Sequence, residues 1–363
     1  MGGGVAPVPY PDAMPTAQPS TRPGAPGTQR IDLVLEGGGV KGIALAGAIE
    51  VLEERGYRIN RIAGSSAGAI AGALSTAGIS GETMVKILRA TDYERFQDGP
   101  WYTRFLLGKA LSILLHNGIY RGDHLTQWLQ EQLTTYGRPG GTGTFADLLY
   151  RDPDPELDLQ DGTQYRLVLT ASDLSAGRLR FLPEDAYDFG TPPAQLRVLD
   201  AVRASVSIPV FFRPVRWRTK KGRPAWLVDG GLLSNFPVSV FDRPEGQVPR
   251  WPTVGIKLSA RPEKNLGVVN KITGPLSFAK AVVDTVTGFY DRMHIESSHS
   301  RARTIFVDTE AVRPTEFDLS DEDQEMLYRK GREAAAEFLD GDGDRPGWDF
   351  PRYVREYRSA SQT

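Results

Sequence analysis

The sequence predicts an α/β fold of three layers, in which a mainly parallel central sheet lies between helices. The first observation is an alternation of strand and helix patterns near the start of the ordered chain, at residues 30–36, 40–55, 59–63 and 69–76. The second is a set of later strand-like runs, at residues 165–171, 253–258 and 304–307. Strands that alternate with helices build a parallel sheet covered on both faces.

Each element of the first unit has its own signal. Residues 30–36 alternate so that three apolar side chains face one way and Val34 faces the other, as in a buried strand. Residues 40–55 carry apolar side chains at helical spacing, and Gly56 suits a helix stop. Small residues recur at i, i+3, i+4 and i+7 from Gly68, which would let the second helix lie close to the sheet.

The later segments give three further predictions. Residues 210–229 are interpreted as a hairpin with a basic, solvated tip, and contact with phosphate head groups is the alternative. Residues 320–339 should form a charged helix, with Ser320 as its N-cap and acidic residues in its first turn. The run 105–115 is apolar nearly all round and too short to span a bilayer. A core or packing helix is favoured there over a lid or acyl-chain wall over the serine that touches a membrane.

Composition excludes several classes of function. Of the 363 residues, 40% are hydrophobic and 24% are charged, which is ordinary for a globular protein. A formal net charge of −2 gives no global attraction to nucleic acid or to an anionic membrane. The absence of cysteine excludes disulfides, thiolate metal sites and cysteine nucleophiles. No run reaches the roughly 20 apolar residues that a membrane-spanning helix needs.

The predicted organisation is one large domain between two loosely held ends. Residues 1–29 are rich in Pro, Gly, Ala, Thr and Ser without a long apolar stretch, so we expect a disordered N-terminal segment rather than a secretory signal. Residues 30–340 are expected to form a single large domain, because motifs at residues 37–42, 64–68 and 229–231 are far apart in sequence yet must meet. Residues 341–363 form a C-terminal tail whose aromatic side chains suggest partial docking.

The pentad Gly64-Ser65-Ser66-Ala67-Gly68 lies where the second strand meets the second helix. A Gly-x-Ser-x-Gly spacing at such a junction is typical of a nucleophile elbow, in which the serine takes a cramped backbone conformation. The hydroxyl of Ser66 would then stand at a helix N-terminus, where free amides stabilise negative charge. Ser66 is therefore the predicted nucleophile.

Two more motifs complete the parts of an acyl-transfer site. The glycine-rich stretch Gly37-Gly38-Gly39-Val40-Lys41-Gly42 follows the first strand, and Asp229-Gly230-Gly231 follows the apolar run 225–228. A backbone cradle, a serine and an acidic partner together indicate acyl transfer.

These motifs, in their residues and their order along the chain, resemble those of the patatin-like phospholipases. In that family a glycine-rich loop precedes the Gly-x-Ser-x-Gly elbow, and a distant Asp-Gly-Gly or Asp-Gly-Ala supplies the aspartate of a Ser-Asp dyad. The resemblance extends from about residue 30 to about 340 and includes the stretch 204–209, Ala-Ser-Val-Ser-Ile-Pro. It implies a patatin-like variant of the α/β-hydrolase type of fold.

The resemblance implies that Asp229 is the partner of Ser66. The four histidines lie in no motif that resembles the histidine of a hydrolase triad. An aspartate with a pKa of about 4 is a poor proton acceptor at pH 7, and partial burial would improve the match.

The backbone amides expected to hold the oxyanion are those of Gly37, Gly38, Gly39 and Ala67. Lys41 would either orient the glycine loop or face solvent. The glycines expected to support the motifs are Gly42, Gly64, Gly68, Gly230 and Gly231.

The activity that the resemblance implies is hydrolysis of carboxylic esters of lipids, with phospholipids favoured, through an acyl-serine intermediate. It implies no metal or organic cofactor, a lipid substrate and no nucleic-acid partner. The expected location is the cytoplasm, with peripheral contact with a membrane left open, as is the oligomeric state. The alternatives are an acyltransferase that uses the same acyl-enzyme, and a catalytically silent fold that binds a lipid or a partner.

Two other classes of site fit less well. The glycine loop also matches a dinucleotide-binding fingerprint, but the second strand ends in Gly64-Ser65-Ser66 and offers no acidic residue for a ribose. Acyl-carrier transacylases often place a histidine beside the nucleophilic serine, whereas position 65 is serine here.

Overall fold

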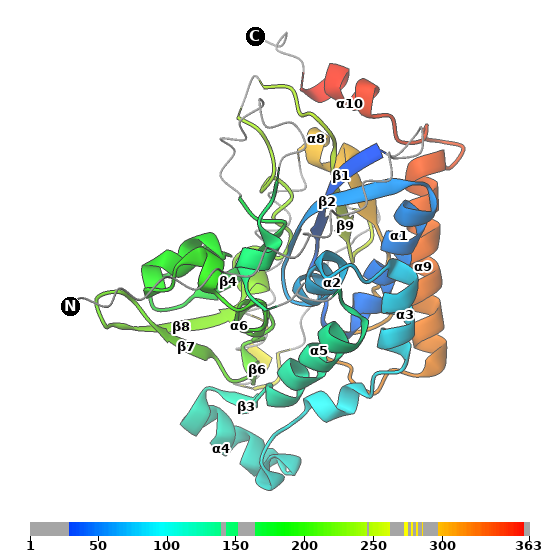
Figure 1. Ribbon diagram of the computed structural model, residues 1–363. Coiled ribbons are helices and arrows are strands. Elements are labelled where there is room, and N and C mark those ends of the chain that lie inside the picture. Colours follow the sequence, from blue (N-terminus) through cyan, green and yellow to red (C-terminus); the bar gives the residue numbers. More distant parts are fainter. Residues whose placement is uncertain are drawn as a thin grey trace, which may run out of the picture.

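The computed structural model describes residues 29–138, 143–151, 164–244, 247–261 and 297–358, with positions 272–274, 277–278, 281 and 285 (Figure 1). The predicted N-terminal segment lies outside these residues, apart from its last residue, Gln29.

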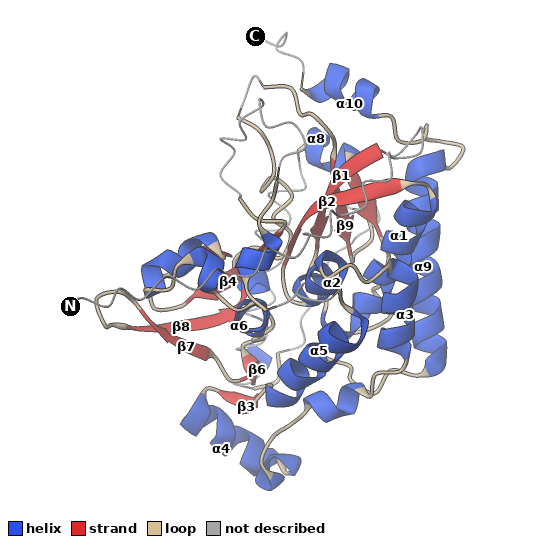
Figure 2. Cartoon of the chain, viewed as in Figure 1, coloured by secondary structure: helices blue, strands red, loops and turns tan. Residues whose placement is uncertain are grey.

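The sheet at the centre of the molecule has eight strands within the described residues, in the order β10-β9-β1-β2-β4-β8-β7, with β5 also paired to β4 (Figure 2). The parallel strands are β1 (Gln29–Leu35), β2 (Tyr57–Gly64), β4 (Leu167–Asp173), β9 (Thr253–Lys257) and β10 (Thr304–Phe306). The antiparallel strands are β5 (Arg178–Leu182), β7 (Val215–Arg218) and β8 (Pro224–Asp229).

Helices of the described residues flank this sheet, except that α4 packs on η3 and on β3 (Gly118–Tyr120). They are α1 (Gly42–Glu54), α2 (Ala67–Thr76), α3 (Gly81–Arg89), α4 (Leu106–His116), α5 (Asp123–Tyr136), α6 (Val198–Ser205), α8 (Ser298–Ala302), α9 (Asp321–Asp340) and α10 (Phe350–Tyr357). Short 3-10 turns are η1 (Gly39–Lys41), η2 (Tyr93–Phe96), η3 (Trp101–Arg104), η4 (Phe145–Leu148), η5 (Glu184–Phe189), η6 (Pro193–Gln195) and η7 (Gly230–Leu232). The predicted fold class, a mainly parallel sheet between helices, is confirmed.

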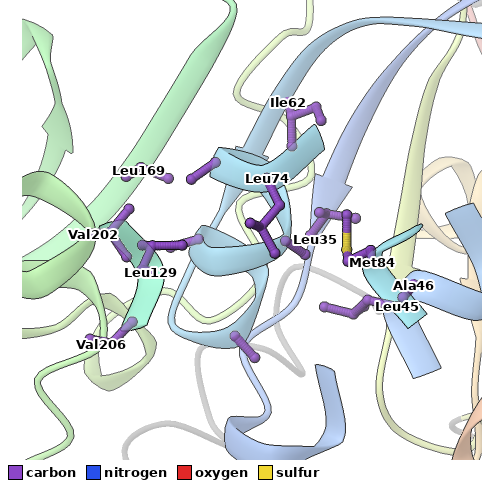
Figure 3. Close-up of a cluster of buried hydrophobic side chains, with 14 of the residues drawn as sticks. Leu35, Leu45, Ala46, Ile62, Leu74, Met84, Leu129, Leu169, Val202 and Val206 are labelled. Atoms are coloured by element: carbon purple, nitrogen blue, oxygen red, sulfur yellow. The ribbon is translucent and has the colours of Figure 1, made fainter. Parts of the chain in front are cut away.

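The alternation predicted for β1 is present. Ile31, Leu33 and Leu35 are fully buried in the main core, whereas Val34 lies in a smaller cluster on the opposite face with Phe236. Figure 3 shows part of the main core, where side chains of α2 meet those of the sheet and of neighbouring helices. The sheet is therefore buried on both faces, as a parallel sheet requires.

Helix α9 begins as predicted and packs along α1, beside it in Figure 1. The Ser320 hydroxyl accepts a hydrogen bond from the Asp323 amide at 3.0 Å and so caps the first turn. The two helices approach closely because glycines face the partner backbone: a Cβ on Gly47 would lie 2.6 Å from the Tyr328 carbonyl oxygen, and one on Gly331 would lie 2.1 Å from that of Ala44. Larger side chains there would force the helices apart.

Two sequence predictions are wrong in part. The hairpin spans only β7 and β8, because β6 (Val210–Phe212) pairs in parallel with β3 (Gly118–Tyr120) in a separate two-stranded sheet. Pro214, between β6 and β7, has no amide with which to continue a ladder. The run 105–115 forms α4, but most of its large apolar side chains are exposed, so it is not a core helix.

No helix in the described part of the chain has the length and hydropathy needed to cross a bilayer. In the predicted tail, Trp348 stacks on Phe338 of α9, with 5.1 Å between ring centroids, and also contacts Tyr353 of α10.

Candidate active site

Ser66 stands at the turn between β2 and α2 with an unusual backbone conformation. Its φ is 50° and its ψ is −118°, one of three positive φ values at described residues other than glycine. Such a conformation is costly and persists only where the surrounding structure imposes it. The geometry is that of a nucleophile elbow, and the side chain lies at the N-terminus of α2 in the wall of a cavity.

The glycines of the pentad allow the tight turn. A Cβ on Gly64 would lie 2.4 Å from the Gly68 carbonyl oxygen, and one on Gly68 would lie 2.3 Å from the Leu35 carbonyl oxygen. Helix α2 therefore starts directly against the end of β1. Any side chain at these two positions would move the helix and the serine that precedes it.

Asp229 is the last residue of β8 and is buried, with 3% of its surface exposed. Its Oδ1 accepts a hydrogen bond from the Gly231 amide at 2.7 Å, which caps η7. Its Oδ2 is buried and has no donor with normal hydrogen-bond geometry among the described residues. One carboxylate oxygen is thus held in place while the other is left available.

Burial raises the pKa of Asp229 to about 7, against the opposing effects of the Ser66 side chain and the Gly231 amide. The effect of the Ser66 hydroxyl on this pKa reflects its proximity to the carboxyl group. The two predicted side chains, which are separated by 163 positions in the sequence (229 minus 66), therefore meet.

The glycine loop supplies unpaired amides next to the serine. The N–H groups of Gly38, Gly39 and Ala67 have no hydrogen-bond acceptor within the described structure. Gly39 has a φ of 57°, and a Cβ on it would lie 1.9 Å from the Pro314 carbonyl oxygen, so only glycine fits.

The structure changes the roles expected for two residues of the glycine loop, Gly37 and Lys41. The Gly37 amide already donates to the Asn235 carbonyl oxygen at 3.2 Å, so Gly37 shapes the loop instead of offering a free donor. Lys41 is buried, which excludes the solvent-facing alternative, and burial lowers the pKa of its amine.

Sequence reasoning missed two residues that hold the site together. The Asn235 side-chain amide donates to the Gly37 carbonyl oxygen at 3.0 Å. Because the Asn235 carbonyl oxygen also accepts from the Gly37 amide, Asn235 binds both backbone groups of Gly37. The Ser205 hydroxyl accepts a hydrogen bond from the Ser66 amide at 3.2 Å. Ser205 lies in the stretch that carried the family resemblance, but Asn235 had no signal beyond its place six residues after Asp229.

Asn235→Ala is expected to lower kcat about tenfold, because it removes one hydrogen bond that orients the glycine loop. KM for a small ester should change little, since the side chain binds Gly37 rather than the cavity. The matched control is Asn60→Ala, which removes a side-chain hydrogen bond to Tyr150 at 3.0 Å. Steady-state kinetics and melting temperature of both variants check the prediction. Equal kcat values for the two variants would refute the positioning role.

A narrow cavity of about 50 Å³ extends from Ser66 into the main core. Its walls are almost wholly apolar, with contributions from Leu74, Met84, Leu88, Phe96, Trp128 and Phe212. Such an apolar lining is typical of a site for a small apolar ligand. No histidine lines the cavity, and the described residues contain no cluster of side chains suited to a metal ion.

A strained serine at a strand-to-helix turn of a mixed α/β sheet places the protein in the class of folds with nucleophile elbows. The chain belongs to the patatin-like phospholipase family, whose model matches residues 33–242. Membership of this family supports lipid hydrolysis as the general class of activity.

Similar proteins include bacterial and viral chains. The protein YqhO of Bacillus subtilis is 36% identical over 316 residues, which cover 85% of this chain and 98% of YqhO. The probable lipid hydrolase 463L of Invertebrate iridescent virus 6 is 24% identical over 213 residues, 57% of this chain and 62% of the viral protein. Among solved structures, VipD from Legionella pneumophila matches 86% of this chain and 67% of its own, with 19% identity and a TM-score of 0.47.

Proposed function

We propose that the protein hydrolyses carboxylic ester bonds of lipids, with phospholipids as the favoured substrates, through a Ser66–Asp229 dyad. The observation that carries the proposal is a buried carboxyl group with one unpaired oxygen beside a serine at an elbow. A general base works best when its pKa is close to the working pH, and the raised pKa of Asp229, about 7, meets that condition.

In the first half of the reaction, Ser66 Oγ attacks the ester carbonyl carbon while its proton passes to Asp229. The negative charge that develops on the carbonyl oxygen is held by the amides of Gly38, Gly39 and Ala67. The intermediate then collapses to an acyl-serine, and the departing alcohol takes the proton from Asp229.

In the second half, Asp229 removes a proton from water, and the resulting nucleophile attacks the acyl carbon. A second oxyanion forms in the same cradle and collapses, which releases the fatty acid and returns the proton to Ser66. The apolar cavity beside Ser66 supports an acyl chain as the group transferred, because its lining has few polar partners for a head group.

A fluorophosphonate probe tests the nucleophile. We expect covalent labelling of the wild-type protein and none of Ser66→Ala, as measured by intact-protein mass spectrometry. The matched control is Ser75→Ala, which changes a half-buried serine near the other end of α2 and should label like the wild type. Failure of the folded wild-type protein to label would favour a catalytically silent lipid-binding fold.

The products formed from a phospholipid panel test the reaction class. We expect free fatty acid and lysophospholipid as the products in water, measured by mass spectrometry. If the acyl group passed mainly to an added alcohol or lysolipid, the protein would be an acyltransferase with the same acyl-enzyme.

A further inference from the structure

The outer surface of η3 and α4 exposes an unusual number of large apolar side chains. Leu107 is 86% exposed and Leu114 is 80% exposed. The surface, here termed the α4 apolar face, consists of Trp101, Phe105, Leu106, Leu107, Leu114 and Leu115. A cluster of exposed large apolar side chains in one short segment is typical of a place where a protein meets a membrane or another protein.

Helix α4 is held in a defined orientation by the small and polar residues on the side opposite the α4 apolar face. The Ser112 hydroxyl is buried and donates to the carbonyl oxygens of Gly118 and Ile119, at 2.9 and 3.2 Å. Gly108 is so close to η3 that a Cβ would lie 1.8 Å from the Tyr102 carbonyl oxygen. The leucines thus point outward because the helix is anchored through its small and polar residues.

The charged side chains of the segment that carries the α4 apolar face have one sign. Between Asp98 and Asp123 the sequence contains Arg104, Lys109 and Arg121 but no acidic residue. The Asp98 carboxylate is occupied by the amides of Arg121, Gly122 and His124, at 2.8 to 3.0 Å. A segment that carries both exposed apolar and cationic side chains complements anionic lipid head groups above a hydrocarbon layer.

The α4 apolar face is structurally continuous with the cavity of Ser66. Ser112 of α4 binds the carbonyl groups at β3, and β3 pairs with β6 through Gly118–Val210 and Tyr120–Phe212. Phe212 in turn lines the cavity, as does Phe96 of η2, on the segment that leads into η3. In Figure 1, α4 lies on the outer side of β3 and β6, at the bottom of the molecule.

We propose that the α4 apolar face docks on an anionic phospholipid bilayer and sets the Ser66 cavity beside the lipid surface. The bilayer would be the surface on which the proposed lipid hydrolase acts. The docking proposal rests on that proposed function only for its biological purpose. Exposed leucines enter the boundary of the acyl chains, while Arg104 and Arg121 lie at the depth of the phosphate groups.

The test is co-sedimentation of the full chain with vesicles of phosphatidylcholine, with and without phosphatidylglycerol. Wild-type protein should bind the anionic vesicles more tightly. The double variant Leu107→Ser/Leu114→Ser should bind about a hundredfold less tightly, because each leucine that enters an apolar phase is worth roughly a tenfold change in affinity. The matched control, Leu149→Ser/Leu174→Ser, changes two exposed leucines away from this face and should bind like the wild type.

Two further measurements separate this proposal from the others. Turnover of a water-soluble short-chain ester should be unchanged in the Leu107/Leu114 variant, whereas turnover of vesicle phospholipid should fall with the loss of binding. Vesicle binding without any ester turnover would support the docking surface but refute the proposed hydrolase activity. Equal vesicle binding by the variant and the wild type, or conversion of a wild-type dimer to a monomer by the variant with no change in vesicle binding, would overturn the docking proposal.

Discussion

Asp229→Asn is expected to lower kcat about 10³- to 10⁴-fold, because general-base catalysis by a positioned side chain contributes up to about that factor. The substitution keeps Oδ1, which can still accept the Gly231 amide, but it removes the basic oxygen that faces no other donor. Binding of substrate should persist, since the apolar cavity does not include Asp229 among its lining residues. Single-turnover kinetics with a chromogenic ester measure the loss directly.

The pH profile of the wild-type protein provides an independent check on the same carboxyl group. Because burial raises the pKa of Asp229 to about 7, kcat/KM should rise as the pH increases through about 7 and level off above it. Below that range the carboxyl group is protonated and cannot accept the Ser66 proton. If kcat/KM stayed constant over roughly two pH units on either side of the Asp229 pKa of about 7, a group other than Asp229 would be the general base.

The same shift predicts an opposite effect on stability. The folded protein binds the Asp229 proton more tightly than the unfolded chain, whose aspartate has a pKa of about 4. The stability contributed by Asp229 is therefore fully present below about pH 4 and is lost as the pH rises through about 7. Asp229→Asn should then melt at a higher temperature than the wild type in mildly alkaline buffer, although it is nearly inactive.

A variant at an exposed carboxyl group controls for the substitution itself. Asp92→Asn replaces an exposed aspartate and should leave kcat, the pH profile and the melting temperature close to wild-type values. If Asp229→Asn also retained near wild-type kcat, the proposed Ser66–Asp229 dyad would be wrong, whatever the melting temperature of that variant.

The features that sequence reasoning found are those encoded within a few neighbouring residues. The alternation around Val34, the cap at Ser320 and the pentad around Ser66 each depend on short-range spacing, and the structure contains all three elements. The fold class followed because alternating strands and helices leave few possible sheet topologies.

The features that it missed depend on partners that are remote in sequence. Asn235 matters because it reaches Gly37, almost 200 positions earlier, and no local pattern encodes that contact. The pairing of β6 with β3 likewise joins segments about 90 residues apart. Helix α4 was misjudged because an apolar helix in a core and one on a surface can share the same composition. Only its anchoring through Gly108 and Ser112 shows which side faces outward.

Gly39→Ala is expected to lower kcat by about 10²- to 10³-fold, the usual effect of losing one oxyanion donor. The positive φ of 57° is unfavourable for alanine, and its Cβ would lie 1.9 Å from the Pro314 carbonyl oxygen. The backbone must therefore turn or shift, and either change moves the Gly38 and Gly39 amides away from the position of the oxyanion. Kinetics with a small soluble ester, with the melting temperature measured in parallel, check this expectation.

Gly56→Ala separates the catalytic effect of Gly39→Ala from its conformational cost. Gly56 has a φ of 79°, close to that of Gly39, yet a Cβ there would meet no atom within 4 Å, and the residue lies at the far end of α1. Alanine at Gly56 should cost about 1 to 2 kcal/mol of stability and leave kcat unchanged. If both variants lost stability and neither lost activity, the glycine loop would not hold the oxyanion. If only Gly39→Ala lost activity, the cost of a positive φ alone could not be the cause, because Gly56→Ala carries a similar cost without displacing the loop amides.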